Sequence, residues 1–198
     1  ADRAKSQIAM QYLAEGMLSG PELPWQAFQV GMGVLSALDE SDLDKRDAYY
    51  MGLRQEMAAF YKDYDQATEQ KLIAEMFKYV FEHIDHNYCP TFLFEADKKY
   101  RGNWDLYAEQ LLARSVFANE ETFNKFMGKP VKKVIEKDPV FLAGQEIYSA
   151  YRGAAMEVSQ ESRDNLKRGI RDFVDGILQI NAQKGILQSP DANSTIRL

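Results

Sequence analysis

The sequence predicts an all-α fold: a multi-helix, bundle-like domain followed by a short extended segment at the C-terminus. Apolar residues recur at three- and four-residue spacing along nearly the whole chain up to Lys184, which is the period of amphipathic helices. Capping residues and prolines divide this pattern into separate segments. No low-complexity segment, clear repeat or glycine/serine linker interrupts it, and 198 residues is a length typical of one domain. We therefore expect one helical domain over residues 1–188 and the start of a strand over residues 189–198.

Two helices are expected in the first part of the chain. A stripe of apolar side chains from Ala4 to Met17 ends at Ser19-Gly20-Pro21, which stops a helix. A second stripe covers residues 23–38 and contains Gly31-Met32-Gly33. These glycines lie inside a helix and not between a strand and a helix, so we interpret them as a close helix contact and not as a phosphate-binding loop.

A third helix should begin at a Ser41 or Asp42 cap and close near Tyr64. Asp65 can cap a fourth helix, which Pro90 stops. The apolar residues of this fourth helix come as adjacent pairs four positions apart, which widens its apolar arc, so we expect it to be central and to contact several neighbours. The pairs are Leu72-Ile73, Met76-Phe77 and Val80-Phe81, followed by Ile84.

Shorter helices are expected in the middle of the chain. One covers about residues 92–99 and one covers residues 103–113. A third starts at an Asn119 cap, where Glu120 and Glu121 favour the positive end of the helix dipole, and closes at Gly128.

A long helix should begin at Pro139, with Asp138 as its cap, and run for more than forty residues to Gly185. Polar residues at 159–162 interrupt its apolar pattern and are a candidate break. The second half of the helix carries one face of mostly apolar side chains. They are Leu166, Ile170, Phe173, Val174, Ile177, Leu178 and Asn181.

The charge pattern argues against a nucleic-acid partner, and the lengths of the apolar runs argue against a membrane span. Lys and Arg total 24 against 30 Asp and Glu, a net charge of −6 with the signs interspersed, whereas a nucleic-acid partner requires a concentrated basic face. The densest basic run, Lys125–Lys137, is interrupted by apolar residues and is typical of a solvated helix face. No apolar run approaches the ~18 to 20 residues of a membrane span. We expect no nucleic-acid partner and no membrane span.

The only histidines, His83 and His86, are the one candidate for a metal site. A spacing of three places both on one helix face, and Asp85 or Cys89 could complete the ligands. The alternative is that they lie in the last turn before Pro90, where the negative end of the dipole favours histidine. Two ligands on one turn do not make a site, and the glutamate of a zinc protease helix is missing, so we expect no metal.

No nucleophilic centre is visible either. No serine lies in a Gly-x-Ser-x-Gly elbow, and a triad would have to use His83 or His86 inside a helical bundle. The single Cys89 is better explained as a buried, inert thiol at a helix end. On its own residues, this chain is predicted to have no catalytic residue and no cofactor, and its substrate-binding residues are unknown.

The last ten residues no longer follow the helical pattern and have the residue types of a turn followed by a β-strand. A Pro190-Asp191 turn precedes Thr195, Ile196 and Leu198, which is how a strand begins. We therefore expect the chain to be one part of a larger protein whose chemistry lies elsewhere. The tripeptide at residues 193–195 also matches a glycosylation acceptor, a pattern that is common by chance.

Three stretches of the chain, in order, resemble the helical domain of the family forty-six serine peptidases, the bacterial dipeptidyl-peptidases seven and eleven. The resemblance covers almost the whole chain, and the second and third stretches are specific. The stretches are Tyr12-Leu13-Ala14-Glu15 with Gly20-Pro21-Glu22-Leu23; Arg114-Ser115-Val116-Phe117-Ala118-Asn119-Glu120-Glu121 with Phe126, Lys129-Pro130 and Lys137-Asp138-Pro139; and residues 189–198.

The resemblance implies a lid. In that family two chymotrypsin-like barrels carry a His-Asp-Ser triad, and an inserted helical domain covers the cleft. The catalytic histidine and aspartate would then precede Ala1 and the serine would follow Leu198. The family's Asn-Tyr-Trp-Lys motif is absent, so recognition of the substrate amine is not assigned here. The residues that lead back into the catalytic domain would be Asp191, Asn193, Thr195 and Arg197.

The implied parent is an exopeptidase that releases N-terminal dipeptides and works in the periplasm, at the cell surface or in the medium. Its implied partners are peptide substrates, its own catalytic domain and, in a homodimer, a second copy. The alternative hypothesis is a non-catalytic helical adaptor that binds a protein through an exposed apolar helix face.

Overall fold

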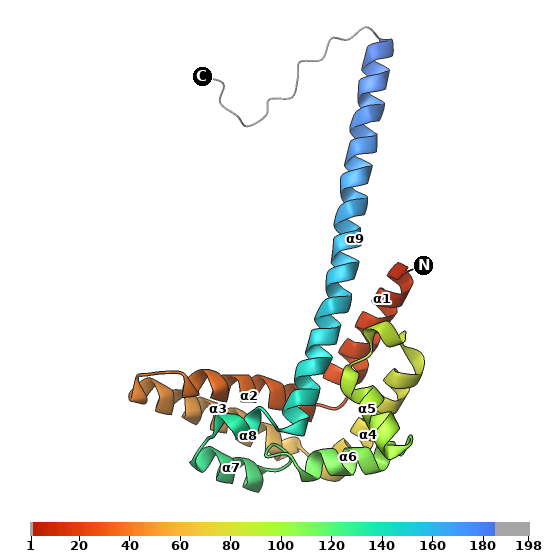
Figure 1. Ribbon diagram of the computed structural model, residues 1–198. Coiled ribbons are helices and arrows are strands. Elements are labelled where there is room, and N and C mark those ends of the chain that lie inside the picture. The colour runs from red at the N-terminus through yellow and green to blue at the C-terminus, as the bar shows by residue number, and fades with distance from the viewer. Residues whose placement is uncertain (1, 185–198) are drawn as a thin grey trace. The chain divides into compact units, whose positions relative to one another are not determined.

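A computed structural model describes residues 2–184, and within that range the fold is entirely helical, without a strand (Figure 1). The predicted all-α class is confirmed. The segments are α1 (Asp2–Gln11), a π-helical segment (Tyr12–Leu18), α2 (Leu23–Leu38), α3 (Leu43–Asp63), α4 (Gln66–His83), a 3-10 turn (His86–Tyr88), α5 (Thr91–Tyr100), α6 (Trp104–Ala113), α7 (Glu120–Gly128), α8 (Lys132–Ile135) and α9 (Pro139–Gln183). The expected extended segment at 189–198 and the boundary after 188 lie outside the described residues.

The chain divides into two compact units, Ala1–Glu157 and Val158–Leu198. The division falls within α9, which is helical throughout, so the candidate break at residues 159–162 is wrong. The polar side chains there bond within the helix: Ser162 Oγ donates to the carbonyl of Val158 at 2.9 Å, and Gln160 Nε2 lies 3.2 Å from the Asp164 carboxylate. Such i,i+4 bonds allow polar residues to continue a helix.

Local capping explains where most helices begin. The carboxylate of Asp42 accepts from the backbone N–H of Asp44 and Lys45 at the start of α3, and Asp65 accepts from Thr68 at the start of α4. These bonds satisfy donors that the first helical turn leaves unpaired. The predicted caps at Asp42, Asp65 and Asn119 are confirmed, and Asn103 caps α6 in the same way.

Helix α2 uses a cap from a distant residue. Its own N-cap residue, Glu22, makes no side-chain cap bond. Instead Glu69 of α4, which is buried, accepts from the backbone N–H of Leu23 at 2.8 Å. Burial raises the pKa of the Glu69 carboxyl, while bonds from the N–H groups of Leu23 and Glu22 oppose the rise.

The first helix differs from its predicted form. The regular α-helix ends at Gln11, and the chain continues as a wider π-helical segment through Leu18. The apolar stripe therefore does not keep one face: Leu13 and Met17 are fully buried, whereas Ile8 is 48% exposed. Insertions of this kind change which side chains face the core.

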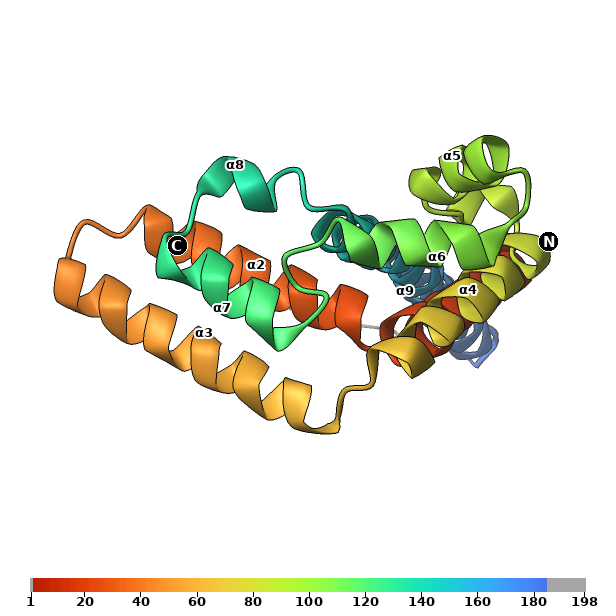
Figure 2. The same cartoon turned by 90° about the horizontal axis from the view of Figure 1, so that it is seen from below.

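The helices of the unit Ala1–Glu157 form two groups, which Figures 1 and 2 show from two directions. In one group α2 and α3 run side by side, with α7 packed on α3 and α8 packed on α2. In the other group α4 packs against α6 and the π-helical segment, and α5 packs on α6. The first turns of α9 start between the two groups.

Helix α4 supplies much of the core, as its paired apolar positions predicted. Ile73, Phe77 and Val80 are fully buried. The ring of Phe77 lies 5.5 Å from that of Phe92 on α5 and 6.5 Å from that of Tyr107 on α6. A side chain held between two other helices packs on more than one side, so α4 is central.

Glycines allow α2 to approach its neighbours closely, which confirms the interpretation of Gly31-Met32-Gly33. A Cβ on Gly31 would lie 2.7 Å from Cε2 of Phe141, and a Cβ on Gly33 would lie 2.8 Å from Cδ2 of Leu53. A Cβ on Gly144 of α9 would overlap the carbonyl oxygen of Pro24. These distances leave no room for a side chain on the glycines. The backbones of α9 and α2 meet at Gly144, while the side chains of Phe141 and Leu53 lie against the backbone of α2 at Gly31 and Gly33.

Candidate functional site

Asp138 is the centre of a buried hydrogen-bond network. The residue is 2% exposed, and its carboxylate accepts four bonds. Two come from the first turn of α9, from the N–H groups of Val140 (3.0 Å) and Phe141 (3.1 Å). Two come from the segment after α6, from Ser115 Oγ (2.9 Å) and the N–H of Val116 (2.7 Å). One side chain therefore caps α9 and anchors a distant loop.

The network joins two parts of the second family-like stretch, residues 114–121 and residues 137–139. Ser115 Oγ also accepts from the N–H of Phe117 at 3.0 Å, which closes the loop on itself. Burial raises the pKa of the Asp138 carboxyl, and its four bonds oppose that rise. The residues next to these partners, Arg114 and Pro139, both line a groove on the surface.

The groove lies among α5, α6 and the first turns of α9, and its volume is about 210 Å³. Side chains on its walls include four charged groups, from Glu95, Lys99, Arg114 and Glu146. The remaining lining is apolar or aromatic. It consists of Phe92, Ala96, Tyr100, Tyr107, Leu111, Pro139, Leu142 and Ala143.

Glu146 of α9 holds one wall of the groove in place. Its Oε2 accepts from Thr91 Oγ1 at 2.7 Å and from the N–H of Phe92 at 3.1 Å. Thr91 and Phe92 are the first residues of α5, whose own N-cap residue, Pro90, makes no cap bond. Glu146 therefore caps α5 from another helix, as Glu69 caps α2. Both bonds use Oε2, so they leave Oε1 of this carboxylate available.

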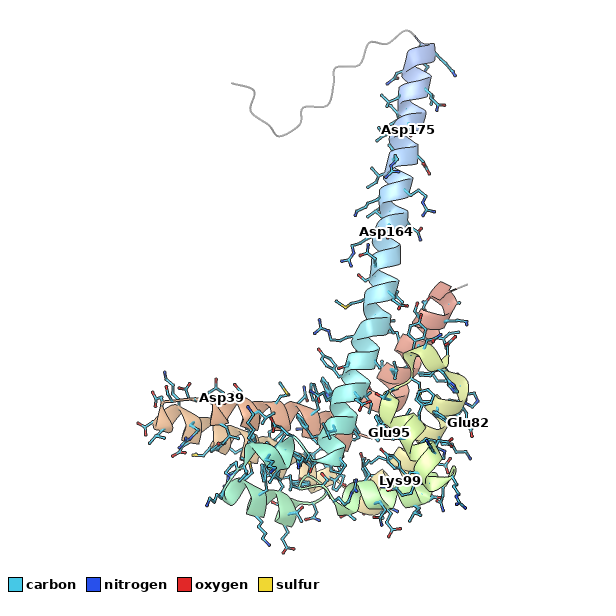
Figure 3. The ribbon with its side chains drawn as sticks, viewed as in Figure 1. Asp39, Glu82, Glu95, Lys99, Asp164 and Asp175 are labelled. Atoms are coloured by element: carbon cyan, nitrogen blue, oxygen red, sulfur yellow. The ribbon has the colours of Figure 1, made fainter. Side chains whose placement is uncertain are left out.

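Aromatic rings line the groove beside Tyr107. This ring contacts Phe92 at a centroid distance of 6.4 Å and Tyr100 edge-on at 5.5 Å. The ammonium of Lys99 lies 5.0 Å from the centre of the Tyr100 ring, within reach of a cation–π interaction. Figure 3 labels Lys99 and Glu95 along α5. The groove thus combines an apolar surface with charges of both signs.

Burial raises the pKa of the Tyr107 hydroxyl above its usual range. Tyr100 and the carboxylates of Glu146 and Glu95 reinforce this rise, whereas the Arg114 guanidinium opposes it. The hydroxyl therefore keeps its proton at neutral pH and can donate a hydrogen bond. The carboxylates of Glu95 and Glu146 and the guanidinium of Arg114 thus place charges of both signs near this hydroxyl.

In the unit Val158–Leu198, the described part of α9 carries an apolar face on its surface. Large side chains on this face are exposed, with Leu166 at 64% and Phe173 at 69%. The apolar face that the sequence predicted is therefore present on α9, and its large side chains are exposed. Its other exposed apolar members are Ile170, Val174, Ile177, Leu178 and Ile180. Figure 3 labels Asp164 and Asp175 on the same helix.

The two histidines do not share a helix face, which corrects the expectation from their spacing. Helix α4 ends at His83, and His86 lies in the following 3-10 turn. Nδ1 of His83 donates to the carbonyl of Tyr79 at 2.7 Å, and its ring stacks on the Tyr79 ring at 4.1 Å. His86 instead stacks on Phe81 at 5.2 Å. Among residues 2–184, no three His, Cys, Asp or Glu side chains are grouped to hold a metal ion.

Cys89 follows the 3-10 turn and is half-buried. Burial raises the pKa of its thiol to about 12, so the reactive thiolate is scarce at neutral pH. This agrees with the interpretation of Cys89 as an inert thiol. The expected junction residues Asp191, Asn193, Thr195 and Arg197 lie outside the described residues. In the range that the structure does describe, no helix has the length and apolar character needed to cross a bilayer.

Sequence reasoning did not find the groove. Arg114 belongs to a family-like stretch, but Glu146 and Tyr107 carry no motif. Glu146 reaches Thr91, 55 residues away, and Ser115 reaches Asp138, 23 residues away. The only signal in the sequence was that the second family-like stretch contains both Ser115 and Asp138.

Comparison with known proteins shows the family to which this chain belongs. The family model for peptidase S46 matches residues 1–198. Dipeptidyl-peptidase 7 of Phocaeicola vulgatus is 31% identical over 137 residues, which is 69% of this chain and 19% of the relative. The Asp/Glu-specific dipeptidyl-peptidase of Porphyromonas gingivalis is 26% identical over 198 residues, 100% of this chain and 27% of the relative. The chain therefore spans about a fifth to a quarter of the length of these relatives.

Solved structures resemble the fold. The crystal structure of Porphyromonas endodontalis DPP11 in complex with the dipeptide Arg-Glu matches with a TM-score of 0.66 and 25% identity, over 80% of this chain and 22% of that one. The same protein in complex with substrate matches over 98% of this chain and 26% of that one, with a TM-score of 0.62 and 24% identity, which shows the fold alone.

Proposed function

Because the chain belongs to the peptidase S46 family, we propose that it is the helical domain of a serine-type dipeptidyl-peptidase and covers the active-site cleft as a lid. In this proposal the triad comes from the rest of the parent chain, which releases dipeptides from the N-termini of peptide substrates. The lid is not catalytic. It narrows the cleft so that only a chain end enters.

The apolar face of residues 158–183 is the observation that carries this proposal. A soluble protein rarely leaves so many large apolar side chains exposed on one helix face, and such a face usually packs against a partner. The parent offers enough additional protein to cover this face, because the matched residues make up only 19% and 27% of two relatives. A domain that packs on its own catalytic domain through this face is positioned to restrict access.

The chemistry of the described residues supports a non-catalytic role. Ser115 donates to the Asp138 carboxylate, but the pair is buried at 6% and 2% exposure and serves as a cap. His83 and His86 are engaged with Tyr79 and Phe81, and neither completes a triad with Ser115. A serine nucleophile requires an accessible hydroxyl paired with a histidine.

Full-length parent enzyme carrying Phe173→Asp tests the lid. The change places a charge in the centre of the exposed apolar face, so we expect the lid to undock. Release of dipeptides from free N-termini should fall relative to cleavage of N-terminally blocked peptides, and the melting temperature should drop. The matched control is Gln179→Asp on the opposite, polar side of the same helix, which should change neither quantity. Unchanged selectivity and melting temperature in the Phe173→Asp enzyme would overturn the proposal.

The isolated chain gives a second test. We expect it to hydrolyse no dipeptidyl substrate, because it offers no histidine-activated nucleophile in its described part. Turnover by pure protein that His83→Ala or His86→Ala abolishes would be enzymatic activity of this chain itself, which the lid proposal forbids.

A non-catalytic adaptor is the second candidate, since an apolar helix face also suits a protein partner. The parent reading frame separates the two. A trypsin-like histidine motif before Ala1 and a Gly-x-Ser-Gly-type loop after Leu198 support the lid, whereas their absence supports the adaptor. The family resemblance also leads us to propose a location outside the cytoplasm, which fractionation of cells that express the parent would test.

A further inference from the structure

The charged groups of the groove do not neutralise one another. Glu95 and Lys99 lie four residues apart on α5, a spacing that commonly gives an ion pair, yet the ion pairs in the described part of the chain join Lys5 to Asp85 and Lys45 to Asp42. The ammonium of Lys99 lies over the Tyr100 ring instead. Two cations and two carboxylates therefore line one small groove with their charges uncompensated by each other.

Polar groups in the groove also keep bonding capacity. The backbone N–H of Arg114 donates to the carbonyl of Leu112, but its guanidinium makes no hydrogen bond or ion pair with a described residue and presents five N–H donors to the groove. The Tyr107 ring contacts the rings of Phe92 and Tyr100, and its protonated hydroxyl makes no hydrogen bond to a described residue. Glu146 keeps Oε1 available after capping α5 through Oε2. Donors for an anion and acceptors for a cation are thus present on the walls of the same groove.

We infer that this groove binds a short peptide with free termini, of about dipeptide size. Arg114 and Lys99 would pair with the terminal carboxylate, and Glu95 and Glu146 would pair with the terminal ammonium. An apolar side chain of the peptide would lie on the surface formed by Leu111 and its aromatic neighbours. Charges of both signs beside an apolar surface complement a zwitterion with an apolar side chain better than they complement a simple anion or cation.

The size and rigidity of the groove fit this ligand. Its volume of about 210 Å³ is below the ~300 to 1,000 Å³ of typical drug or cofactor pockets, which favours a ligand of one or two residues. Glu146 fixes α5 to α9, and Asp138 fixes the loop beside Arg114 to the start of α9. Pre-formed walls reduce the entropy lost on binding.

This site does not depend on the lid proposal. Each residue that lines it belongs to the unit Ala1–Glu157, and no group from the rest of the parent is required. The lid proposal concerns the apolar face of residues 158–183, so either proposal can fail while the other stands.

The test is a titration of the ¹⁵N-labelled 198-residue chain with the dipeptide Ala-Leu, followed by amide chemical shifts. We expect saturable shifts at Lys99, Tyr107 and Arg114 with a Kd in the millimolar range or below. Arg114→Gln and Lys99→Gln should each weaken binding by about tenfold, the effect of one lost charge-assisted contact. Lys98→Gln, a charge loss at the exposed neighbour outside the groove, is the matched control and should not change the Kd.

Modified dipeptides test the charges of the ligand. N-acetyl-Ala-Leu lacks the ammonium and Ala-Leu amide lacks the carboxylate, so both should bind more weakly than Ala-Leu. The amide should lose no further affinity in the Arg114→Gln variant, since the partner of that residue is already missing. Binding of the modified peptides as tight as that of Ala-Leu, equal losses in Lys98→Gln and Lys99→Gln, or the absence of saturable shifts at about 10 mM ligand would each overturn the inference.

Discussion

Removal of the Asp138 carboxylate should test how the unit Ala1–Glu157 is held together. The side chain accepts from the N–H groups of Val116, Val140 and Phe141 and from Ser115 Oγ, at 2.7 to 3.1 Å. Asp138→Ala leaves these four donors without their acceptor in a place where water has little access. It also removes the cap of α9.

The expected loss is about 3 to 5 kcal/mol of unfolding free energy. Loss of an N-cap costs about 0.5 to 2 kcal/mol. The bonds to Ser115 and Val116 add more, because a hydrogen bond to a charged group contributes about 1.5 to 3 kcal/mol. Asp138→Ala also removes the cost of burying a charged carboxylate, which offsets part of this loss of unfolding free energy. Burial raises the pKa of Asp138 because it disfavours the charged form.

Urea unfolding followed by tryptophan fluorescence measures this loss. Both tryptophans, Trp25 and Trp104, belong to the unit Ala1–Glu157, so their signal reports on the unit that contains the network. Ser115→Ala removes one of the four bonds and should cost about 1 to 3 kcal/mol. The double variant should lose less than the sum of the two, since the changes share a bond. A loss below about 1 kcal/mol in Asp138→Ala would refute the structural role assigned to this carboxylate.

Three further changes probe the core and its buried acid. Phe77→Ala should cost about 3 to 5 kcal/mol, because this ring is fully buried between α5 and α6; a loss well under 1 kcal/mol would contradict the central place of α4. Gly144→Ala should lower the melting temperature more than Gly153→Ala, because the first methyl meets the Pro24 carbonyl and the second meets nothing within 4 Å; equal effects would contradict the close packing of α2 and α9. Burial raises the pKa of Glu69 in the folded state, so folding favours the protonated form of this carboxyl. Its contribution to the unfolding free energy is therefore complete below the unfolded pKa of about 4.3 and declines as pH rises through the folded pKa. The unfolding free energy of the native chain should therefore fall relative to that of Glu69→Gln over this range, and a constant difference would show that Glu69 titrates normally.

Local chemistry accounts for the predictions that succeeded. Asp42, Asp65 and Asn119 cap their helices by bonding N–H groups two or three residues ahead, so their roles follow from short-range sequence. The fourth helix was expected to be central because its apolar residues come in pairs, and Phe77 is buried as this pattern requires. Gly31 was interpreted correctly as a contact glycine, because its helical context excluded a phosphate loop.

Helix ends and polar interruptions were less predictable. The spacing of His83 and His86 implies one helix face only if the helix continues past His83, and it does not. Ser162 and Gln160 suggested a break in the long helix, but each bonds within the helix and continues it. In both cases a balance of a few weak local bonds decides the outcome, and residue type alone does not reveal that balance.

The sequence by itself determined the all-α class, most helix starts and the apolar face of the last helix, because caps and periodicity act over one or two turns. Only the tertiary structure decided which groups meet across the fold. Glu69 caps a helix that begins 46 residues earlier, and Glu146 caps one that begins 55 residues earlier. These helices lack side-chain caps of their own, so buried N–H groups are satisfied by whichever carboxylate the packing brings to them. The groove beside Arg114 exists for the same reason: its walls come from segments that only the packed core brings together.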